Sequence, residues 1–227
     1  IDLYWVHAWD FTTPIEEVMR GLDDLVSAGK VLYVGISDTP AWIVSRANTI
    51  ADFRGWSPFV GLQIRYSLID RTAEADLLPM ARALDLAVTP WSVLGAGVLT
   101  GKYSRGNEPA DGRAKAGAAT RERNLEIAEI VVSIAEQIDC TPSQVAIAWV
   151  RQQDALVIPL IGARNLPQLT DNLGALDVRL TDDQLARLDE VSRVDLGFPH
   201  NFVTDPNILD LVSGGSWERL DNHRRGR

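Results

Sequence analysis

The architecture of the chain is clearest in the stretch Val31-Leu32-Tyr33-Val34-Gly35-Ile36-Ser37-Asp38-Thr39-Pro40. Its first six residues are mostly β-branched, aromatic or otherwise apolar, which predicts a buried strand over 31–36. The next two residues form a polar strand end. The Thr39-Pro40 pair predicts a helix start, with Thr39 as the N-cap and Pro40 at the first helical position, and the helix is expected to reach about Arg54. Strand, polar end and helix together make one strand-helix unit.

The same unit recurs along the chain. The patterns predict five strands, at 1–7, 31–36, 59–63, 87–91 and 157–159. They predict helices at 14–28, 40–54, 73–84 and 120–137, then from 141, over 166–173 and from a cap at Thr181. Because strands alternate with helices, the sequence predicts an α/β fold in which helices pack outside a parallel sheet.

Two architectures fit this alternation, an open doubly wound sheet and a closed (β/α)8 barrel of the TIM type. The open sheet is usually marked by a Gly-x-Gly-x-x-Gly turn after its first strand, and none follows the strands that end near His7 and Ser37. Side chains at the ends of many strands converge only when the strands form a ring, so the barrel is favoured. The strand-end residues that support it are His7, Ser37 with Asp38, Gln63, Trp91 with Ser92, and Gly162–Arg164.

Composition bounds the class of protein. The chain has 227 residues, 46% of them hydrophobic, which predicts one globular domain over 1–227 with a C-terminal tail from 203. Its formal net charge of −9 argues against nucleic acid as a partner, because phosphate binding needs clustered Lys and Arg, and the basic cluster at 224–227 is interpreted as a solvated tail. Cys140 is the only cysteine, which favours a reducing, cytoplasmic location. No apolar run predicts a membrane span, and no metal site is indicated.

Five segments, in chain order and at the ends of successive strands, carry a resemblance to a known family. They are Asp2-Leu3-Tyr4-Trp5-Val6-His7, Gly35-Ile36-Ser37-Asp38, Gln63-Ile64-Arg65-Tyr66-Ser67, Thr89-Pro90-Trp91-Ser92-Val93-Leu94-Gly95-Ala96-Gly97-Val98-Leu99-Thr100-Gly101-Lys102-Tyr103 and Ile158-Pro159-Leu160-Ile161-Gly162-Ala163-Arg164. Together they resemble the aldo-keto reductase family, over about Ile1 to Phe202. The resemblance implies an NADPH-dependent reductase of aldehydes and ketones, acting on a small-molecule carbonyl substrate.

One catalytic residue is implied by the resemblance. His7 matches the active-site histidine of the family, which orients and polarises the substrate carbonyl. An imidazole at a strand end can donate a hydrogen bond to an oxygen that gains negative charge, so the role is chemically sound. The alternative is a histidine that bonds only within its own loop.

Four residues match positions that hold the nicotinamide. Ser37, Asp38 and Gln63 match residues that hydrogen-bond the carboxamide, and Ser and Gln suit a group with both donors and acceptors. Many relatives carry Asn at the position of Asp38, whose ionised carboxylate only accepts. Trp91 matches the aromatic residue that stacks on the nicotinamide ring. The alternatives are helix capping for Ser37 and Asp38 and a core position for Trp91.

Two further groups match the phosphate and adenosine ends of the cofactor. Residues of the glycine-bearing loop match the pyrophosphate cover, where Gly lets backbone N–H groups approach phosphate oxygens: Ser92, Leu94, Gly95 and Gly97, with Lys102 adding charge. The adenosine end is matched by Gly162, Ala163, Arg164, Gln168, Asp171 and Asn172. Arg164 suits the ribose 2′-phosphate, which predicts NADPH rather than NADH, and Asn172 suits the adenine edge. The alternative for Arg164 is an ordinary surface position.

The proton donor of the family is a Tyr supported by a Lys and an Asp, and none of Tyr4, Tyr33, Tyr66 and Tyr103 matches it. We therefore expect a chain truncated at its N-terminus to about strands four to eight of the barrel, and inactive or nearly so by itself. Five strands cannot close a ring, so the open barrel edge is expected to favour self-association. A non-catalytic NADP(H)-binding module and an interaction module remain as alternatives.

Overall fold

A computed structural model describes residues 1–103 and 122–221 of the chain. The chain divides into two compact units, Ile1–Arg193 and Val194–Arg227, and the predicted beginning of the tail at 203 lies within the second unit. The basic cluster at 224–227 and the expected helix start at 120–121 lie outside the described residues.

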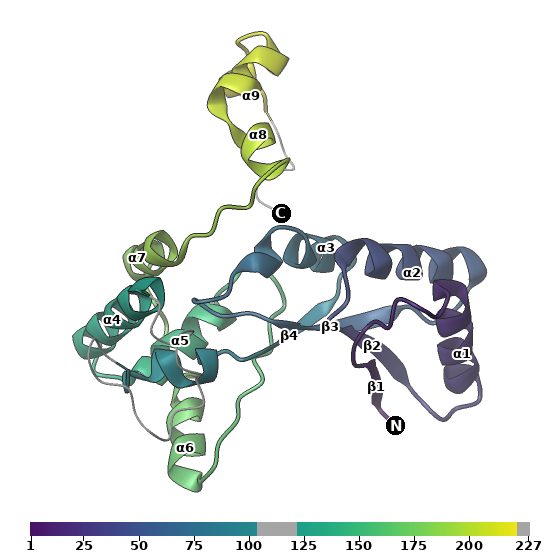
Figure 1. Cartoon of the computed structure of the whole chain (residues 1–227), viewed down its shortest axis with the longest axis horizontal. Coiled ribbons are helices and arrows are strands. Elements are labelled where there is room, and N and C mark those ends of the chain that lie inside the picture. The colour runs from purple at the N-terminus through teal and green to yellow at the C-terminus, as the bar shows by residue number, and fades with distance from the viewer. Residues whose placement is uncertain (104–121, 222–227) are drawn as a thin grey trace. The chain divides into compact units, whose positions relative to one another are not determined.

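The first unit is built on a parallel sheet of four strands in the order β1-β2-β3-β4 (Figure 1). The strands are β1 (Leu3–Val6), β2 (Tyr33–Ser37), β3 (Phe59–Arg65) and β4 (Ala87–Trp91). All three strand pairs are parallel, which confirms the predicted α/β fold with a parallel sheet.

The predicted fifth strand at 157–159 is wrong as a regular strand, because the described residues there form only an isolated bridge between Val88 and Val157. The segment nevertheless runs along β4. The N–H of Val88 donates to the carbonyl of Leu156, and the N–H of Ile158 donates to the carbonyl of Val88, both at 2.8 Å. The N–H of Leu160 likewise donates to the carbonyl of Pro90 at 2.9 Å, but Pro90 has no N–H to donate in return, so the ladder with β4 stays incomplete.

Helices follow the strands, and Figure 1 shows α1, α2 and α3 in succession along the sheet. The helices of the first unit are α1 (Ile15–Ser27), α2 (Ala41–Arg54), α3 (Leu77–Ala83), α4 (Glu122–Gln137), α5 (Pro142–Arg151), α6 (Leu166–Gly174) and α7 (Asp182–Ser192). Two short 3-10 helices, η1 (Thr72–Glu74) and η2 (Gly95–Thr100), lie in loops. The predicted helix at 73–84 therefore begins later, at Leu77.

The predicted caps have mixed outcomes. Thr181 caps α7 through a capping box, as predicted, and Thr141, where the sequence predicted the start of a helix, caps α5 in the same way. The prediction for Thr39 is wrong, because Pro40 is the N-cap of α2 and no side chain caps it. The hydroxyl of Thr39 instead donates to the carbonyl of Ser37 at 2.8 Å. Helical backbone is disfavoured for a residue before proline, and Asp38 with φ of +43° follows the end of β2, so the helix begins only at Ala41 and Pro40 is not its first residue as predicted.

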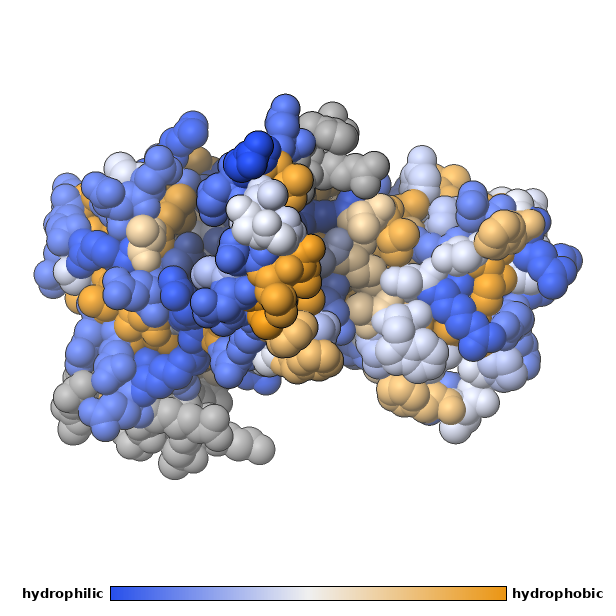
Figure 2. Space-filling view, turned by 90° about the horizontal axis from the view of Figure 1, so that it is seen from above, coloured by the Kyte–Doolittle hydropathy of each residue, from blue (hydrophilic) through white to orange (hydrophobic). Residues whose placement is uncertain are grey.

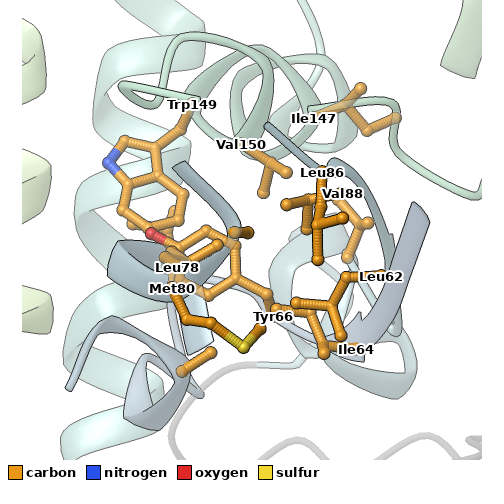
Figure 3. Close-up of a cluster of buried hydrophobic side chains, with 14 of the residues drawn as sticks. Leu62, Ile64, Tyr66, Leu78, Met80, Leu86, Val88, Ile147, Trp149 and Val150 are labelled. Atoms are coloured by element: carbon orange, nitrogen blue, oxygen red, sulfur yellow. The ribbon is translucent and has the colours of Figure 1, made fainter. Parts of the chain in front are cut away.

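The core lies between the sheet and the helices that cover it (Figure 3). Leu62, Ile64 and Val88 alternate along β3 and β4 toward this side, where Trp149 of α5 and Met80 of α3 are also buried. Full burial of each such side chain stabilises the fold by roughly 1.5–3 kcal/mol. The strands are therefore fixed in place by the side chains that point away from the candidate site described below.

The opposite face of the sheet has room for one large side chain. The indole of Trp5 lies over Gly35 and Gly61, which are in register with it across β2 and β3. A Cβ added at Gly35 would lie 2.5 Å from Cε3 of Trp5. Glycine is required at this position because any side chain would occupy the space of the indole ring.

Gly35→Ala is therefore expected to lower the free energy of unfolding by about 1–3 kcal/mol, the usual cost of overpacking. Gly21→Ala is the matched control, because nothing lies within 4 Å of its Cβ position. Within α1 that change is expected to be neutral or to stabilise by up to about 1 kcal/mol. Urea denaturation of both variants checks the pair, and similar changes in both would contradict the packing argument.

The second unit contains α8 (His200–Thr204), α9 (Pro206–Ser213) and η3 (Trp217–Arg219). None of these three elements has a buried residue. Phe198, Leu211 and Val212 are all more than 70% exposed. Figure 2 shows apolar patches among hydrophilic residues on one face of the molecule.

Candidate functional site

The carboxyl ends of the four parallel strands share one edge of the sheet. His7 directly follows β1, Ser37 ends β2, and Trp91 ends β4. Ser37 is in register with Gln63, and Gln63 with Thr89. Alternate residues of a strand share a face, so these side chains lie on the Trp5 face of the sheet, one step further toward the carboxyl edge. The edge therefore brings together residues that the sequence placed at the ends of separate strands.

His7 is exposed at this edge, immediately beyond the last residue of β1. Val6 is in register with Ile36, so His7 comes level with Ser37 on the neighbouring strand. The position suits a group that meets a ligand above the sheet. Its role as hydrogen-bond donor stays a prediction.

Two hydroxyl groups in this row have no hydrogen-bond partner among the described residues, and both are buried. They are the Oγ of Ser37 and the Oγ1 of Thr89. A buried hydroxyl without a partner is costly, so each has capacity for a further polar group. Ser37 was expected to bond a carboxamide, and its hydroxyl is free to make such a bond. Solvent does not reach this atom in the structure, so the role stays a prediction. Thr89 was missed by sequence reasoning, and only its register with Gln63 points to it.

The indole of Trp91 has polar neighbours on two sides. Its Nε1–H donates to Oδ1 of Asp38 at 3.2 Å. The guanidinium carbon of Arg65 lies 5.8 Å from the centre of the ring, and Arg65 also pairs with Asp70 at 2.9 Å. Asp38 thus bonds Trp91, a contact that the sequence did not predict.

A cavity of about 740 Å³ begins at Trp91 and extends to α6, a size typical of ligand sites. Many of the predicted cofactor residues line it: Trp91, Ser92, Leu94, Gly97, Lys102, Gly162, Arg164, Gln168, Asp171 and Asn172. Sequence reasoning missed other lining residues, namely Val93, Ala96, Thr100, Ser143, Leu160 and Ile161. The predicted residues outside the lining are His7, Ser37, Asp38, Gln63, Gly95 and Ala163.

The glycine-bearing loop covers one part of this cavity. Gly97 has φ of +99°, a conformation that side chains rarely adopt. A Cβ there would lie 3.1 Å from Nζ of Lys102, so glycine also lets the lysine cross the loop. The N–H groups of Gly95 and Gly97 donate to the carbonyls of Ser92 and Leu94 within the loop. These bonds hold the turn together. Because both N–H groups are already bonded, Lys102 is the group of this loop that brings positive charge to the cavity lining.

The start of α6 fixes the other part of the cavity. Asn165 caps the helix by accepting from the N–H of Gln168, whose Oε1 accepts from the N–H of Arg164 at 2.9 Å. Asn172 is buried, and its Nδ2 donates to the carbonyl of Gly162 at 3.3 Å. Gln168 and Asn172 thereby fasten the 162–164 loop to the helix. The side chain of Arg164 remains exposed at the cavity.

Asp171 has a partner that the sequence did not reveal. The Nε2 of Gln144 donates to its carbonyl at 2.9 Å and to its carboxylate at 3.2 Å. Gln144 also completes the capping box of α5 with Thr141. Asp171 therefore joins α6 to the start of α5, and its predicted cofactor contact must share the carboxylate with this bond.

Other kinds of site find no support within residues 1–103 and 122–221. No group of three or more His, Cys, Asp or Glu side chains is placed there to hold a metal ion. No helix in the same ranges has both the length and the apolar character needed to cross a membrane.

The chain is similar to known proteins over most of its length. The family model described as "Aldo/keto reductase family" matches residues 1–193. A probable aryl-alcohol dehydrogenase of Saccharomyces cerevisiae is 39% identical, over 94% of this chain and 67% of its own length. A norsolorinic acid reductase of Aspergillus flavus is 37% identical over 99% of this chain, and an aryl-alcohol dehydrogenase [NADP(+)] of Phanerodontia chrysosporium is 36% identical over 93%. The chain spans 58% and 57% of the lengths of these last two relatives.

Proposed function

The chain belongs to the aldo/keto reductase family, and from this premise we propose that it forms the cofactor-holding part of an NADPH-dependent reductase of aldehydes and ketones. We also propose that the four parallel strands, with residues 156–160 beside β4, are part of a (β/α)8 barrel. The substrate class is a small-molecule carbonyl compound. The name of one relative includes NADP(+), which agrees with the proposed cofactor.

The cavity between η2 and α6 is the observation that carries the proposal. It gathers the aromatic ring of Trp91, the cation of Lys102 and the cation of Arg164, which come from segments far apart in the chain. A dinucleotide phosphate needs a flat surface for one ring and positive charge for its phosphates. The residues that line this cavity fit both requirements.

Each residue has a proposed task in this arrangement. NADPH supplies the hydride when bound. Trp91 offers the flat surface for the nicotinamide, Lys102 faces the pyrophosphate, and Arg164 pairs with the 2′-phosphate. His7 donates a hydrogen bond to the carbonyl oxygen of the substrate, which polarises it toward hydride acceptance.

The described tyrosines do not supply an obvious proton donor. Tyr66 is buried, its hydroxyl donates to Glu74 at 2.6 Å, and burial together with this carboxylate raises its pKa far above the ordinary value. Tyr103 is also buried. Tyr4 and Tyr33 are exposed, but Tyr4 faces the side of the sheet opposite to Trp5 and His7, and Tyr33 begins β2 at the end of the strand away from the candidate site. We therefore propose that residues 1–227 by themselves bind NADPH weakly and reduce carbonyl compounds poorly or not at all. This observation also favours a second candidate function, an NADP(H)-binding module without turnover.

NADPH fluorescence titration followed by a turnover assay with a generic aldehyde tests both proposals. Saturable binding without measurable NADPH oxidation is the expected result. Failure to bind at millimolar NADPH would contradict the cofactor site. Turnover at a rate ordinary for enzymes would contradict the missing proton donor.

Arg164→Ala is expected to weaken NADPH binding about 10- to 100-fold, because a hydrogen-bonded pair with a charged group contributes about 1.5–3 kcal/mol. NADH has no 2′-phosphate, so its affinity is expected to change little. Arg179→Ala is the control, since Arg179 is exposed and does not line the cavity. Titration of the three proteins with both nucleotides checks the prediction, and an equal loss for NADH and NADPH would refute the 2′-phosphate contact.

A further inference from the structure

We propose that Asp38 is a positioning residue that fixes the plane of Trp91, and that Arg65 covers one face of the indole so that only the other can receive the nicotinamide. This inference rests on the proposed function, because it concerns the same cofactor site. It gives Asp38 a task different from the carboxamide contact that the family resemblance implies.

A hydrogen bond joins the side chains of Trp91 and Asp38. Trp91 has a single polar atom, and its Nε1–H donates to Oδ1 of Asp38 at 3.2 Å. Stacking of a ligand on an aromatic ring uses the faces, whereas this bond acts at the ring edge. An acceptor at the edge opposes rotation of the indole about its own side-chain bond, and it does so without obstructing either face.

The backbone of Asp38 is itself held in place by β3. Asp38 has φ of +43°, in the left-handed region that Asp tolerates better than most residues. Its N–H donates to the carbonyl of Gln63 on the next strand at 3.2 Å. The acceptor for the indole is therefore anchored to β3 and does not depend on a mobile side chain alone.

The two faces of the Trp91 indole differ, because Arg65 lies over one of them. Arg65 is in register with Trp91 across β3 and β4, and its guanidinium carbon lies 5.8 Å from the ring centre. The bond to Asp70 at 2.9 Å holds this guanidinium in place. Arg65 and Asp38 line a separate hollow of about 410 Å³, whereas Trp91 lines the cofactor cavity. In the proposed arrangement, the face of the indole that Arg65 covers is turned away from the cofactor cavity.

The contact requires only an acceptor oxygen at position 38, which Asp and Asn can both supply. Both side chains present an oxygen that accepts the indole N–H, although only Asn could also donate to a carboxamide. The expected requirement is therefore an acceptor at position 38, and the negative charge is not essential.

The test combines NADPH titration with the indole N–H resonance of Trp91 in the protein without cofactor. Asp38→Ala and Asp38→Gly remove the acceptor, and Gly accommodates the positive φ if Ala does not. Both are expected to shift this resonance, speed its exchange with water and weaken NADPH binding roughly three- to tenfold, the range of one hydrogen bond. Asp38→Asn keeps the acceptor and should stay within about twofold of the original affinity.

Trp91→Phe completes the test because it keeps a flat ring but has no N–H. In that background, removal of the Asp38 carboxylate is expected to change NADPH affinity no further. Equal losses with and without the indole N–H, or a loss in Asp38→Asn as large as in Asp38→Gly, would overturn the inference. If the unaltered chain binds no NADPH, the proposed function fails together with the purpose of the positioning. If the unaltered chain binds NADPH and the Asp38 variants bind it with the same affinity, the proposed function stands and only the positioning role of Asp38 is refuted.

Discussion

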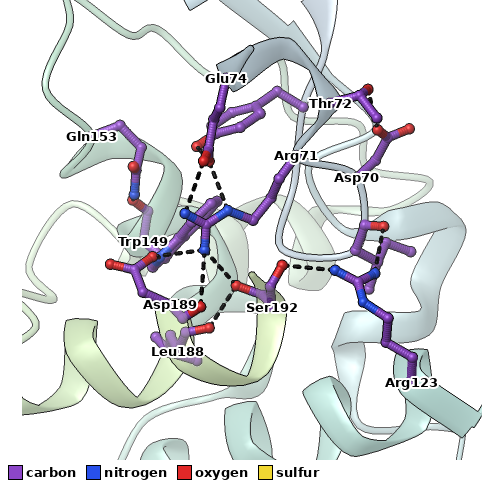
Figure 4. Close-up of polar contacts among 12 residues, drawn as sticks. Asp70, Arg71, Thr72, Glu74, Arg123, Trp149, Gln153, Leu188, Asp189 and Ser192 are labelled. Carbon is purple, nitrogen blue, oxygen red and sulfur yellow. Dashed lines mark hydrogen bonds and ion pairs between the residues drawn. The ribbon is translucent and has the colours of Figure 1, made fainter. Parts of the chain in front are cut away.

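Arg71→Met is expected to lower the free energy of unfolding by about 3–5 kcal/mol, the typical cost of removing one partner from a buried ion pair. The Arg71 side chain is only 11% exposed and bonds both oxygens of Glu74, at 2.7 and 3.0 Å (Figure 4). Its Nη1 also donates to Asp189 at 2.8 Å and to Ser192 at 2.7 Å. One guanidinium therefore ties the loop after β3 to helix α7.

The surroundings of Arg71 explain why loss of its charge destabilises the fold. Burial alone would lower the pKa of Arg71, but the hydrogen bond and charge of Glu74 raise it, so the group stays charged. Its guanidinium carbon also lies 5.0 Å from the ring centre of Trp149, a fully buried residue of α5. Methionine would fill part of the volume, yet it would leave Glu74 and the end of α7 without their cation.

Arg82→Met is the matched control, because Arg82 pairs with Asp154 at 2.6 Å while the two side chains are 41% and 84% exposed. Such a surface pair contributes about 0–1 kcal/mol. Urea denaturation of both variants at neutral pH gives the comparison. A loss for Arg71→Met no larger than that for Arg82→Met would show that the Arg71 contacts do not hold the loop and helix together.

Trp91→Ala is expected to weaken NADPH binding about 10- to 100-fold. The change removes the flat surface proposed for the nicotinamide, and truncation of an aromatic residue that stacks on a base costs roughly 1–3 kcal/mol in nucleic-acid complexes. It also leaves Asp38 without its indole partner. The effect is expected to exceed that of the Asp38 variants, because the stacking surface is lost rather than merely less well oriented.

Trp42→Ala serves as the control, since Trp42 on α2 is 63% exposed and does not line the cavity. Its NADPH affinity is expected to match that of the unaltered chain. Fluorescence titration measures both variants, and denaturation confirms that both remain folded. Unchanged affinity in a folded Trp91→Ala protein would remove Trp91 from the proposed site.

Local signals in the sequence were sufficient for much of the fold. Short runs of β-branched, aromatic and other apolar residues predicted the four strands, because such side chains suit a buried sheet. Thr181 was predicted as the cap of α7, because a Thr side chain can accept from an N–H in the first turn of a helix. Local signals failed at Thr39, which precedes a proline, and at 157–159, where Pro90 of β4 has no N–H to complete the ladder.

The cavity could be anticipated in part. Trp91, Gly97 and Arg164 were predicted from motifs at strand ends, and the structure brings all three to one cavity. The bond between Gln144 and Asp171 was not predicted, because an amide and a carboxylate 27 residues apart carry no mark of their pairing.

The sequence by itself determined that strands and helices alternate and that polar residues end the strands, because both follow from interactions within a few residues. Only the tertiary structure decided which side chains bond one another: Asp38 with Trp91, Arg71 with Asp189, and Asn172 with Gly162. Such choices depend on strand register and helix packing, which bring donor and acceptor within hydrogen-bonding distance only after the elements have packed together. Local motifs therefore predict which residues form the candidate site, whereas the assembled fold determines their geometry.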